Sequence, residues 1–310
     1  MNRINLITFA DGNYIQHACV LLLSLADVVD YERPYRIFVY YSNCSAEALK
    51  KFDQSLQSKL PPNITYELIE LNRKLDNRLQ PKGDHLSAEI YNKLFIYDDL
   101  PHELEKVLFL DADIVLLRDP AEIYDLDLKQ AVLAAVHEPV FELIPEEAQK
   151  TIGVSPDKYF NSGVMLVNLP LWRSMKVSSK ALEFCLDKWE DTPYHDQDAF
   201  NYVVGGNWIK ISPLWNPRIE NVITTSDGNT TTLTKEEVYR KNLSYLIHYS
   251  GPGKPWFYMS FHPQKRIYLD YLEKTEFRDY QFPDYSTANR IRRQVLVMRR
   301  AFYFLRTGAV

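Results

Sequence analysis

The chain has little of what marks secreted, membrane-spanning or repetitive proteins. Its 310 residues include three cysteines, and Cys19, Cys44 and Cys185 lie far apart without metal-type spacing. An odd and scattered set of this kind predicts free thiols in a reducing compartment. No apolar run approaches the ~20 residues that span a bilayer, and the N-terminal segment turns polar too early for a signal peptide. We therefore expect a cytoplasmic protein.

Acidic residues are missing from the end of the chain. Residues 286–310 contain six arginines and neither Asp nor Glu, whereas the rest of the chain carries 30 basic and 41 acidic side chains. The body is therefore acidic, which argues against nucleic acid as a partner. A basic tail on such a body favours contact with an anionic surface.

Composition and periodicity predict an α/β fold. Apolar residues make up 46% and charged residues 25% of the chain, as in ordinary soluble globular proteins. Strand-like and helix-like segments alternate, which implies a parallel sheet covered on both faces. The expected strands are 4–10, 35–41, 64–70, 106–112, 131–136, 162–169 and 245–250, and the expected helices are 14–27, 45–58, about 170–190 and a short one near Asp196. Segment 71–87 is polar and predicts a loop.

We expect a catalytic domain over residues 1–270 and an extension over 271–310. Apolar residues recur in the extension at helical spacing, at Ile291, Val295, Met298, Phe302 and Leu305. On a helix they form one stripe with arginines on both sides, which is typical of a helix lying in a membrane interface. The alternatives are a helix docked on the body and a coiled-coil strand. The membrane interpretation places the protein peripherally at the inner face of the cytoplasmic membrane.

Two aspartates follow a strand-like run in "KVLFLDADIVL". An ionised carboxylate next to a buried strand is costly unless it is paired, hydrogen-bonded or bound to a metal. In an extended chain Asp111 and Asp113 point to one side, with Ala112 opposite. Such a pair of oxygen ligands suits Mg²⁺ or Mn²⁺. The alternative is an ordinary turn at the end of a strand.

A second segment, "LIHYSGPGKPW", combines a histidine with glycines and a lysine. His248 can supply a third metal ligand through neutral imidazole. Gly251 and Gly253 let the backbone approach a phosphate, and Lys254 supplies a positive charge for it. Alone, the segment also reads as a Pro/Gly turn with a structural His. Combined with the aspartate pair, it favours a metal–diphosphate site.

Two further polar segments are compatible with a site but do not identify one. "PYHDQDAFN" places Asp196, Gln197 and Asp198 at a helix start, where one acid is explained by capping alone. "YFNSGVMLVNL" places Asn161 and Ser162 at the entrance of a strand, where a generic turn has the same composition.

Taken together, five segments in this order and spacing resemble glycosyltransferase family 8: "FADGNY", "LFLDADIVL", "YFNSGVMLVNL", "DQDAFN" and "HYSGPGKPW". The resemblance covers about residues 3–260. It is strongest to bacterial lipooligosaccharide α-galactosyltransferases and more distant to glycogenin and galactinol synthases. It implies a GT-A fold, which is a Rossmann-like nucleotide-sugar domain with a mostly parallel mixed sheet, here followed by a helical extension.

The resemblance also implies an activity. The chain would be a retaining transferase that moves galactose or glucose from a UDP-sugar to a hydroxyl of a lipooligosaccharide, a glycolipid or another surface glycan. The cofactor would be Mn²⁺, with Mg²⁺ as the alternative.

Site residues follow from the resemblance by match of motif. Three would hold the metal: Asp111, Asp113 and His248. The nucleotide and diphosphate would be contacted by Ala10, Asp11, Asn13, Tyr14, Lys93, Ala112, Gly251 and Lys254, with Tyr14 stacking on the uracil. The hexose would be lined by Asn161, Asp196 and Gln197. Two positions depart from the family pattern, because Gly12 replaces a frequent second acid and Glu138 matches the acceptor-contacting acids only loosely.

The same match predicts a mechanism. Lys254 and the backbone of Gly251 would stabilise charge on the departing phosphate, and Asp196 with the Gln197 carbonyl would face the positive charge developing on the sugar. Retention needs either an enzyme nucleophile or attack on the face from which UDP leaves. Gln197 occupies the nucleophile position, and an amide is a poor nucleophile, which favours same-face attack.

Three other classes of protein share parts of this pattern. The segment "LFLDADIV" also resembles the D-x-D-x-[TV] nucleophile strand of haloacid-dehalogenase-type phosphatases. That family needs a later G-D-x-x-x-D motif, which is absent after residue 113. A sugar-nucleotide pyrophosphorylase needs a basic Gly-rich loop, and "ADGNY" has no basic residue. A non-catalytic sugar-binding protein predicts no metal-dependent release of UDP.

Overall fold

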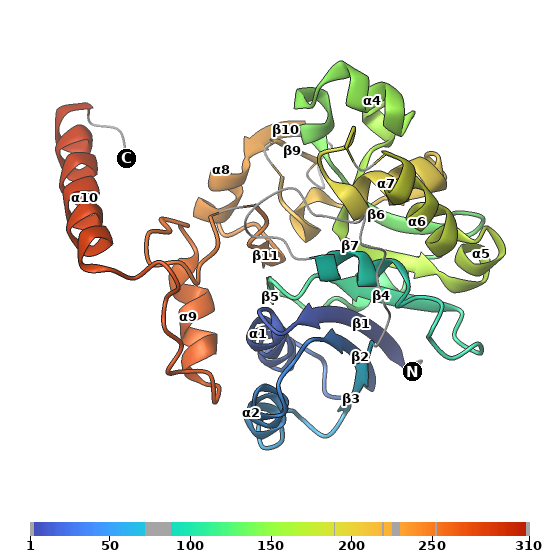
Figure 1. The fold of residues 1–310 in the computed structure, drawn as a ribbon, viewed down its shortest axis with the longest axis horizontal. Coiled ribbons are helices and arrows are strands. Elements are labelled where there is room, and N and C mark those ends of the chain that lie inside the picture. The colour runs from blue at the N-terminus through green and yellow to red at the C-terminus, as the bar shows by residue number, and fades with distance from the viewer. Residues whose placement is uncertain are drawn as a thin grey trace.

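The computed structural model describes residues 3–71, 88–188, 190–218, 220–224, 230–251 and 253–307. Its centre is a seven-stranded sheet in the order β3-β2-β1-β4-β7-β6-β8 (Figure 1). The strands are β1 (Ile4–Asp11), β2 (Tyr35–Ser42), β3 (Ile64–Glu70), β4 (Lys106–Leu110), β6 (Leu133–His137), β7 (Phe160–Asn168) and β8 (Trp208–Lys210). β3, β2, β1 and β4 are mutually parallel, and β7 runs antiparallel to both β4 and β6. The expected mostly parallel mixed sheet is confirmed.

Helices cover both faces of the sheet. One layer is α1 (Ile15–Ala26) and α2 (Ala46–Leu56), and the other is α5 (Leu169–Ser174), α6 (Val177–Lys188) and α7 (His195–Val204). Successive side chains of a strand point to opposite faces. In β4, Leu108 and Leu110 therefore enter the core shared with α1, while Val107 and Phe109 enter the core shared with α6 and α7.

The remaining elements surround this sandwich. Two small antiparallel pairs join β5 (Ile114–Leu116) to β11 (Leu246–His248) and β9 (Glu220–Thr224) to β10 (Thr230–Thr234). The other α-helices of the described residues are α3 (Ala121–Tyr124), α4 (Glu146–Ile152), α8 (Lys235–Arg240), α9 (Lys265–Glu273) and α10 (Thr287–Thr307), and a 3-10 helix over Ala88–Leu94 carries Lys93.

Most expected elements are present, with two corrections. The helix expected over about 170–190 is in fact α5 followed by α6, because Lys176 between them adopts a positive φ of 55°. The strand expected over 106–112 ends at Leu110 and resumes as β5 after a turn. The Ser45 hydroxyl caps α2 by accepting from the amide of Ala48. Of the expected loop 71–87, residues 72–87 lie outside the described residues.

The interruption between β4 and β5 positions the site. β4 stays in the main sheet, whereas β5 pairs with β11, and Ile114 lies opposite His248. The turn between the two strands contains Asp111 and Asp113. Two carboxylates and a distant imidazole are thereby brought to the carboxyl ends of the parallel strands, where ligands bind in α/β sheets.

The C-terminal part contains one helix packed on the body and one peripheral helix, α10, whose Arg293 lies over the rings of Tyr258 (5.1 Å) and Phe261 (5.4 Å). α9 packs on α1 through buried Tyr268 and Leu272, so residue 270, the expected domain boundary, falls inside a helix of the body. Figure 1 shows α10 at the edge of the molecule, standing clear of the sheet and its helices. Among the described helices, none has the length and apolar character that crossing a bilayer requires.

Candidate active site

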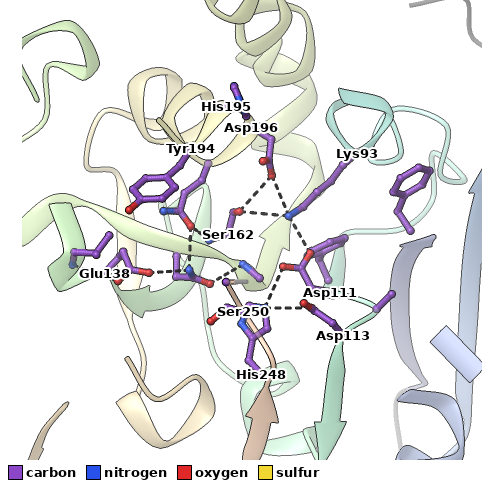
Figure 2. A pocket seen from close by; sticks show the side chains of 18 of the residues that line it. Lys93, Asp111, Asp113, Glu138, Ser162, Tyr194, His195, Asp196, His248 and Ser250 are labelled. Carbon is purple, nitrogen blue, oxygen red and sulfur yellow. Dashed lines mark hydrogen bonds and ion pairs between the residues drawn. The ribbon is translucent and has the colours of Figure 1, made fainter. Parts of the chain in front are cut away.

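A cavity of about 660 Å³ opens at the carboxyl ends of β1 and β4 (Figure 2). It brings together most of the residues selected from the sequence: Asp11, Tyr14, Lys93, Asp111, Ala112, Asp113, Glu138, Asn161, Asp196, Gln197, His248, Gly251 and Lys254. Two others flank the cavity without lining it, since Ala10 is buried in β1 and Asn13 is exposed beside it.

Three potential metal ligands converge at the floor of the cavity. One ligand atom from each of Asp111, Asp113 and His248 lies within 4.8 Å of the others. His248 Nε2 is 3.2 Å from an oxygen of Asp113 and 3.6 Å from an oxygen of Asp111. Carboxylate oxygens with one imidazole form a donor set that suits Mn²⁺ or Mg²⁺.

The tautomer of His248 follows from a chain of side-chain amides. Glu138 Oε2 accepts from Asn161 Nδ2 (2.8 Å), and Asn161 Oδ1 accepts from Asn216 Nδ2 (2.7 Å). Asn216 thus turns Oδ1 to His248 Nδ1, at 3.0 Å, and the imidazole must donate there. Because burial lowers the pKa of His248, Nε2 keeps a lone pair. A lone pair facing two carboxylates is stabilised by a cation between them.

Space for that cation depends on Gly163. A Cβ at this position would lie 2.4 Å from Cε1 of His248 and 2.7 Å from Oδ2 of Asp111, so a larger residue would fill the cluster. The pairing of β6 with β7 shifts register here, from Ala135↔Met165 to Val136↔Asn161. Such a bulge redirects side chains next to many active sites. The donor set and the open space together fit a divalent metal ion.

Two buried lysines neutralise the acids of the cavity. Lys93 Nζ lies 3.0 Å from both Asp111 and Asp196, and Lys254 forms an ion pair with Asp113. Burial opposes charge on each lysine, but the carboxylates outweigh it and raise the pKa of Lys93 and of Lys254. Burial also opposes charge on Asp113, yet Lys254 and His248 hold its pKa well below the usual range. Lys93, Lys254 and Asp113 are therefore ionised at neutral pH.

The two acids in the first turn of α7, Asp196 and Asp198, have different roles. Asp198 accepts from the backbone amide of Tyr194 (2.7 Å) and from the hydroxyl of Tyr159, so it has a structural role. Asp196 pairs with Lys93, and Gln197 Oε1 accepts from Asn161 Nδ2 at 3.0 Å. The capping explanation holds for one acid of the segment, and the neighbouring two residues line the cavity.

The opposite end of the cavity is bounded by Tyr14. Its ring packs edge-on against Trp256, with centroids 5.6 Å apart, and Trp256 stacks on the buried His17 at 3.5 Å. Burial raises the pKa of Tyr14 to about 12. The neighbouring Gly12 explains the departure from the family pattern, since a Cβ there would lie 2.3 Å from the carbonyl oxygen of Asn43.

Two basic side chains in the wall of the cavity, Arg218 and Lys235, were not expected from the sequence. Arg218 pairs with the fully buried Glu138 at 2.6 Å, and Lys235 donates to the carbonyl of His248 at 3.1 Å. Burial lowers the pKa of Lys235 to about 7. Both cations belong to stretches without a motif, where Lys235 reads as an ordinary residue of a helix start. No signal in the sequence distinguishes them.

Comparison with known proteins identifies the family. The model of "Glycosyl transferase family 8" matches residues 5–260. General stress protein A of Bacillus subtilis (strain 168) is 24% identical, over 88% of this chain and 94% of that protein. Lipopolysaccharide 1,2-glucosyltransferase of Escherichia coli (strain K12) is 32% identical, over 68% of this chain and 62% of that protein. Lipopolysaccharide 1,3-galactosyltransferase of Salmonella typhimurium (strain LT2) is 24% identical, over 86% of this chain and 77% of that protein.

Solved structures support the fold. The galactosyltransferase LgtC, crystallised with donor and acceptor sugar analogues, superimposes with a TM-score of 0.67 at 21% identity, covering 88% of this chain and 96% of that chain. The glycosyltransferase GlyE of Streptococcus pneumoniae TIGR4 superimposes with a TM-score of 0.62 at 18% identity, covering 88% of this chain and 60% of that chain. The resemblance drawn from the five motifs is confirmed, and the phosphatase alternative is not retained. The chain belongs to glycosyl transferase family 8 and is a glycosyltransferase with the GT-A fold.

Proposed function

We propose that the protein is a retaining hexosyltransferase that moves galactose or glucose from a UDP-sugar to a hydroxyl of a lipooligosaccharide, a glycolipid or another surface glycan. The observation that carries the proposal is the cluster of Asp111, Asp113 and His248 beside Lys254, inside a cavity of a family 8 chain. Two relatives carry names that specify transfer of glucose or galactose to lipopolysaccharide.

The donor would bind along the floor of the cavity. Asp111, Asp113 and His248 would hold Mn²⁺, with Mg²⁺ as the alternative, and the ion would supply Lewis-acid stabilisation of the departing diphosphate. Lys254 and the backbone of Gly251 would contact the same phosphates. The base and ribose would lie at the end bounded by Asp11 and Tyr14, with Ala10, Asn13, Lys93 and Ala112 completing the nucleotide site.

The hexose would lie between the metal cluster and α7, against Asn161, Asp196 and Gln197. Gln197 Oε1 already accepts two hydrogen bonds, from Asn161 Nδ2 (3.0 Å) and the amide of Ser162 (3.1 Å). An amide oxygen so engaged is a poor nucleophile but can face positive charge on the sugar. Glu138, fully buried and paired with Arg218, is not free to attack. We therefore favour attack by the acceptor on the face from which UDP leaves.

The tail would attach the enzyme to the inner face of the cytoplasmic membrane. α10 is formed as expected, and the part of its stripe that the structure describes is exposed, with Ile291 at 56%, Val295 at 37% and Met298 at 55%. The arginines of this helix have no acid within residues 286–310 to neutralise them. An apolar stripe flanked by cations fits an anionic lipid surface, which is where a lipid-linked acceptor would be presented.

The proposal is tested by release of UDP from UDP-galactose, UDP-glucose, UDP-N-acetylglucosamine and UDP-N-acetylgalactosamine, with Mn²⁺ or EDTA. We expect slow hydrolysis of one hexose donor, lost in EDTA and in Asp113→Asn. That result would also name the sugar. If wild type releases no UDP from any donor and does not bind UDP in a metal-dependent way, the proposed function is wrong.

A further inference from the structure

Two cations in the cavity wall converge on one hydroxyl. Arg218 Nη1 lies 3.0 Å from Ser250 Oγ, and Lys235 Nζ lies 3.5 Å from the same atom. All three side chains line the cavity. They come from separate parts of the fold: the segment before β9, the first residue of α8 and the loop after β11. Ser250 thus marks a point in the wall that two positive charges can reach.

The charges at this point are not balanced by the protein residues that the structure describes. Lys93 and Lys254, elsewhere in the cavity, each contact at least one carboxylate. Glu138 balances one of the two cations at Ser250, through Arg218. Within the described part of the chain, Lys235 forms no ion pair, and its Nζ lies near the carbonyl of His248, the Ser250 hydroxyl and the ring of Tyr239 (5.7 Å to the centroid). When protonated, Lys235 therefore carries a charge that no described carboxylate pairs with, in a largely buried place where an unpaired charge is costly.

A second polar atom here also lacks a partner. The Nε of Arg218 is buried and makes no hydrogen bond to any described residue. A guanidinium presents five N–H donors, and carboxylates or phosphates are the groups that engage several of them at once. The wall therefore has both the charge and the free donor for an anion.

The position of the pair separates it from the expected nucleotide end. Figure 2 shows Glu138 and Tyr194 on one side of the cavity, with Asp113 and Lys93 on the other, and Ser250 between Glu138 and Asp113. Tyr194, on the side of Glu138, is 38% exposed and offers an aromatic face to a sugar ring. A ligand on this side would meet the hexose from beyond the metal cluster, as an acceptor must.

We propose that Arg218 and Lys235 bind an anionic substituent, a phosphate or a carboxylate, on the acceptor glycan. This inference rests on the proposed function and adds to it the charge of the acceptor. The anion supplies the missing partner of Lys235, and charge-assisted hydrogen bonds orient the acceptor. Neutral sugars of the same shape leave Lys235 unpaired and bind more weakly.

The test is calorimetric binding to the full chain saturated with Mn²⁺ and UDP, so that the diphosphate site is already filled. The probes are glucose 6-phosphate, glucuronate and methyl glucoside. We expect at least one anionic sugar to bind about tenfold or more tighter than methyl glucoside. Lys235→Gln should abolish this preference. Arg218→Lys, which keeps a cation for Glu138, should reduce it, and Lys241→Gln, at an exposed position just after α8, should leave it intact.

The outcomes separate the two sources of the anion and the two proposals. Preference for glucose 6-phosphate alone identifies a phosphate, and preference for glucuronate alone a carboxylate. Equal binding of all three sugars, binding of none, or a preference that survives Lys235→Gln overturns the inference. A parallel loss of UDP affinity in Lys235→Gln also overturns it, by assigning the pair to the donor. Wild type that binds no UDP with Mn²⁺ instead refutes the proposed function.

Discussion

Asn216 Oδ1 accepts the proton of His248 Nδ1 across 3.0 Å. The orientation of this amide is not a free choice, because Asn216 Nδ2 donates to Asn161, which in turn donates to the carboxylate of Glu138. A carboxylate only accepts, so Glu138 sets the polarity of every bond along the chain. The lone pair of His248 Nε2 is thereby directed at Asp111 and Asp113.

Asn216→Ala should therefore weaken metal binding without removing a ligand. Loss of a group that orients a metal-binding His typically costs about 10–100-fold in affinity. The measurement is titration with Mn²⁺, monitored by electron paramagnetic resonance of the free ion. Asn207→Ala, at an exposed position, is the matched control and should bind normally. Affinity within about twofold of wild type in Asn216→Ala would show that His248 is oriented by other contacts.

Gly163→Ala should exclude the metal while the chain still folds. The added Cβ would lie 2.4 Å from His248 Cε1 and 3.0 Å from Asn161 Oδ1, so these side chains must shift. Overpacking of this kind costs about 1–3 kcal/mol of stability. We expect a lower melting temperature by circular dichroism and no measurable affinity for Mn²⁺. A folded variant with normal Mn²⁺ affinity would contradict the assignment of this space to the metal.

We expect the protein to lose stability in mild acid because His262 is partly buried. Burial, with a smaller effect of Lys235, lowers its pKa to about 4, and its Nδ1 accepts from the amide of Gln264 at 3.2 Å. An unfolded histidine titrates near 6.5. Between about pH 6.5 and 4 the unfolded chain therefore binds more protons than the folded one, and the free energy of unfolding falls as the pH falls.

The measurement is urea unfolding of wild type and His262→Gln at several values between pH 7 and pH 4. The variant should lose less stability than wild type over this range, because glutamine takes up no proton. Identical slopes for the two proteins would mean that His262 titrates alike in the folded and unfolded chains. His17, whose pKa burial also lowers, is unchanged in both proteins and contributes equally.

We expect the tail, residues 286–310, to bind anionic vesicles. Deletion of residues 286–310 should abolish sedimentation with phosphatidylglycerol vesicles but spare activity on a soluble acceptor. Reversal of Arg290, Arg292 and Arg299 to Glu should have the same effect while keeping the helix. Reversal of three exposed lysines of the body, Lys50, Lys180 and Lys188, is the control and should not. Unchanged vesicle binding after the deletion would exclude the tail as the membrane contact.

The parallel half of the fold was predictable because its signals are local. Segments such as 35–41 consist mostly of β-branched and aromatic residues, and the helix expected from residue 45 does begin there, with Ser45 as its N-cap. The division of the long helix at Lys176 was not predictable, because a positive φ in a lysine leaves no trace in composition. β9 and β10 were not expected, because β10 has four threonines among its five residues and few of the apolar residues that mark the other strands.

The site was predictable to the extent that its residues lie in motifs. Asp111, Asp113, His248 and Lys254 were selected and do converge. Asn216, Arg218 and Lys235 were not selected, because their roles arise from contacts with residues 13 to 80 positions away, such as Glu138. Polar residues of this kind look like solvated surface until the chain is folded around them.

The pairing of β5 with β11 also sets the order in which the protein can become competent. Asp113 and Lys254 are separated by 141 residues, and Asp113 leaves the ribosome well before its partner. Domains begin to fold during synthesis, at about 5–20 residues per second. A nascent chain that has released β8 but not β11 has its sheet core and two carboxylates, but not the imidazole or the lysine. Under the proposed function, such a chain lacks the groups that would hold the diphosphate, and we expect it to be inactive until β11 and Lys254 have folded onto the body.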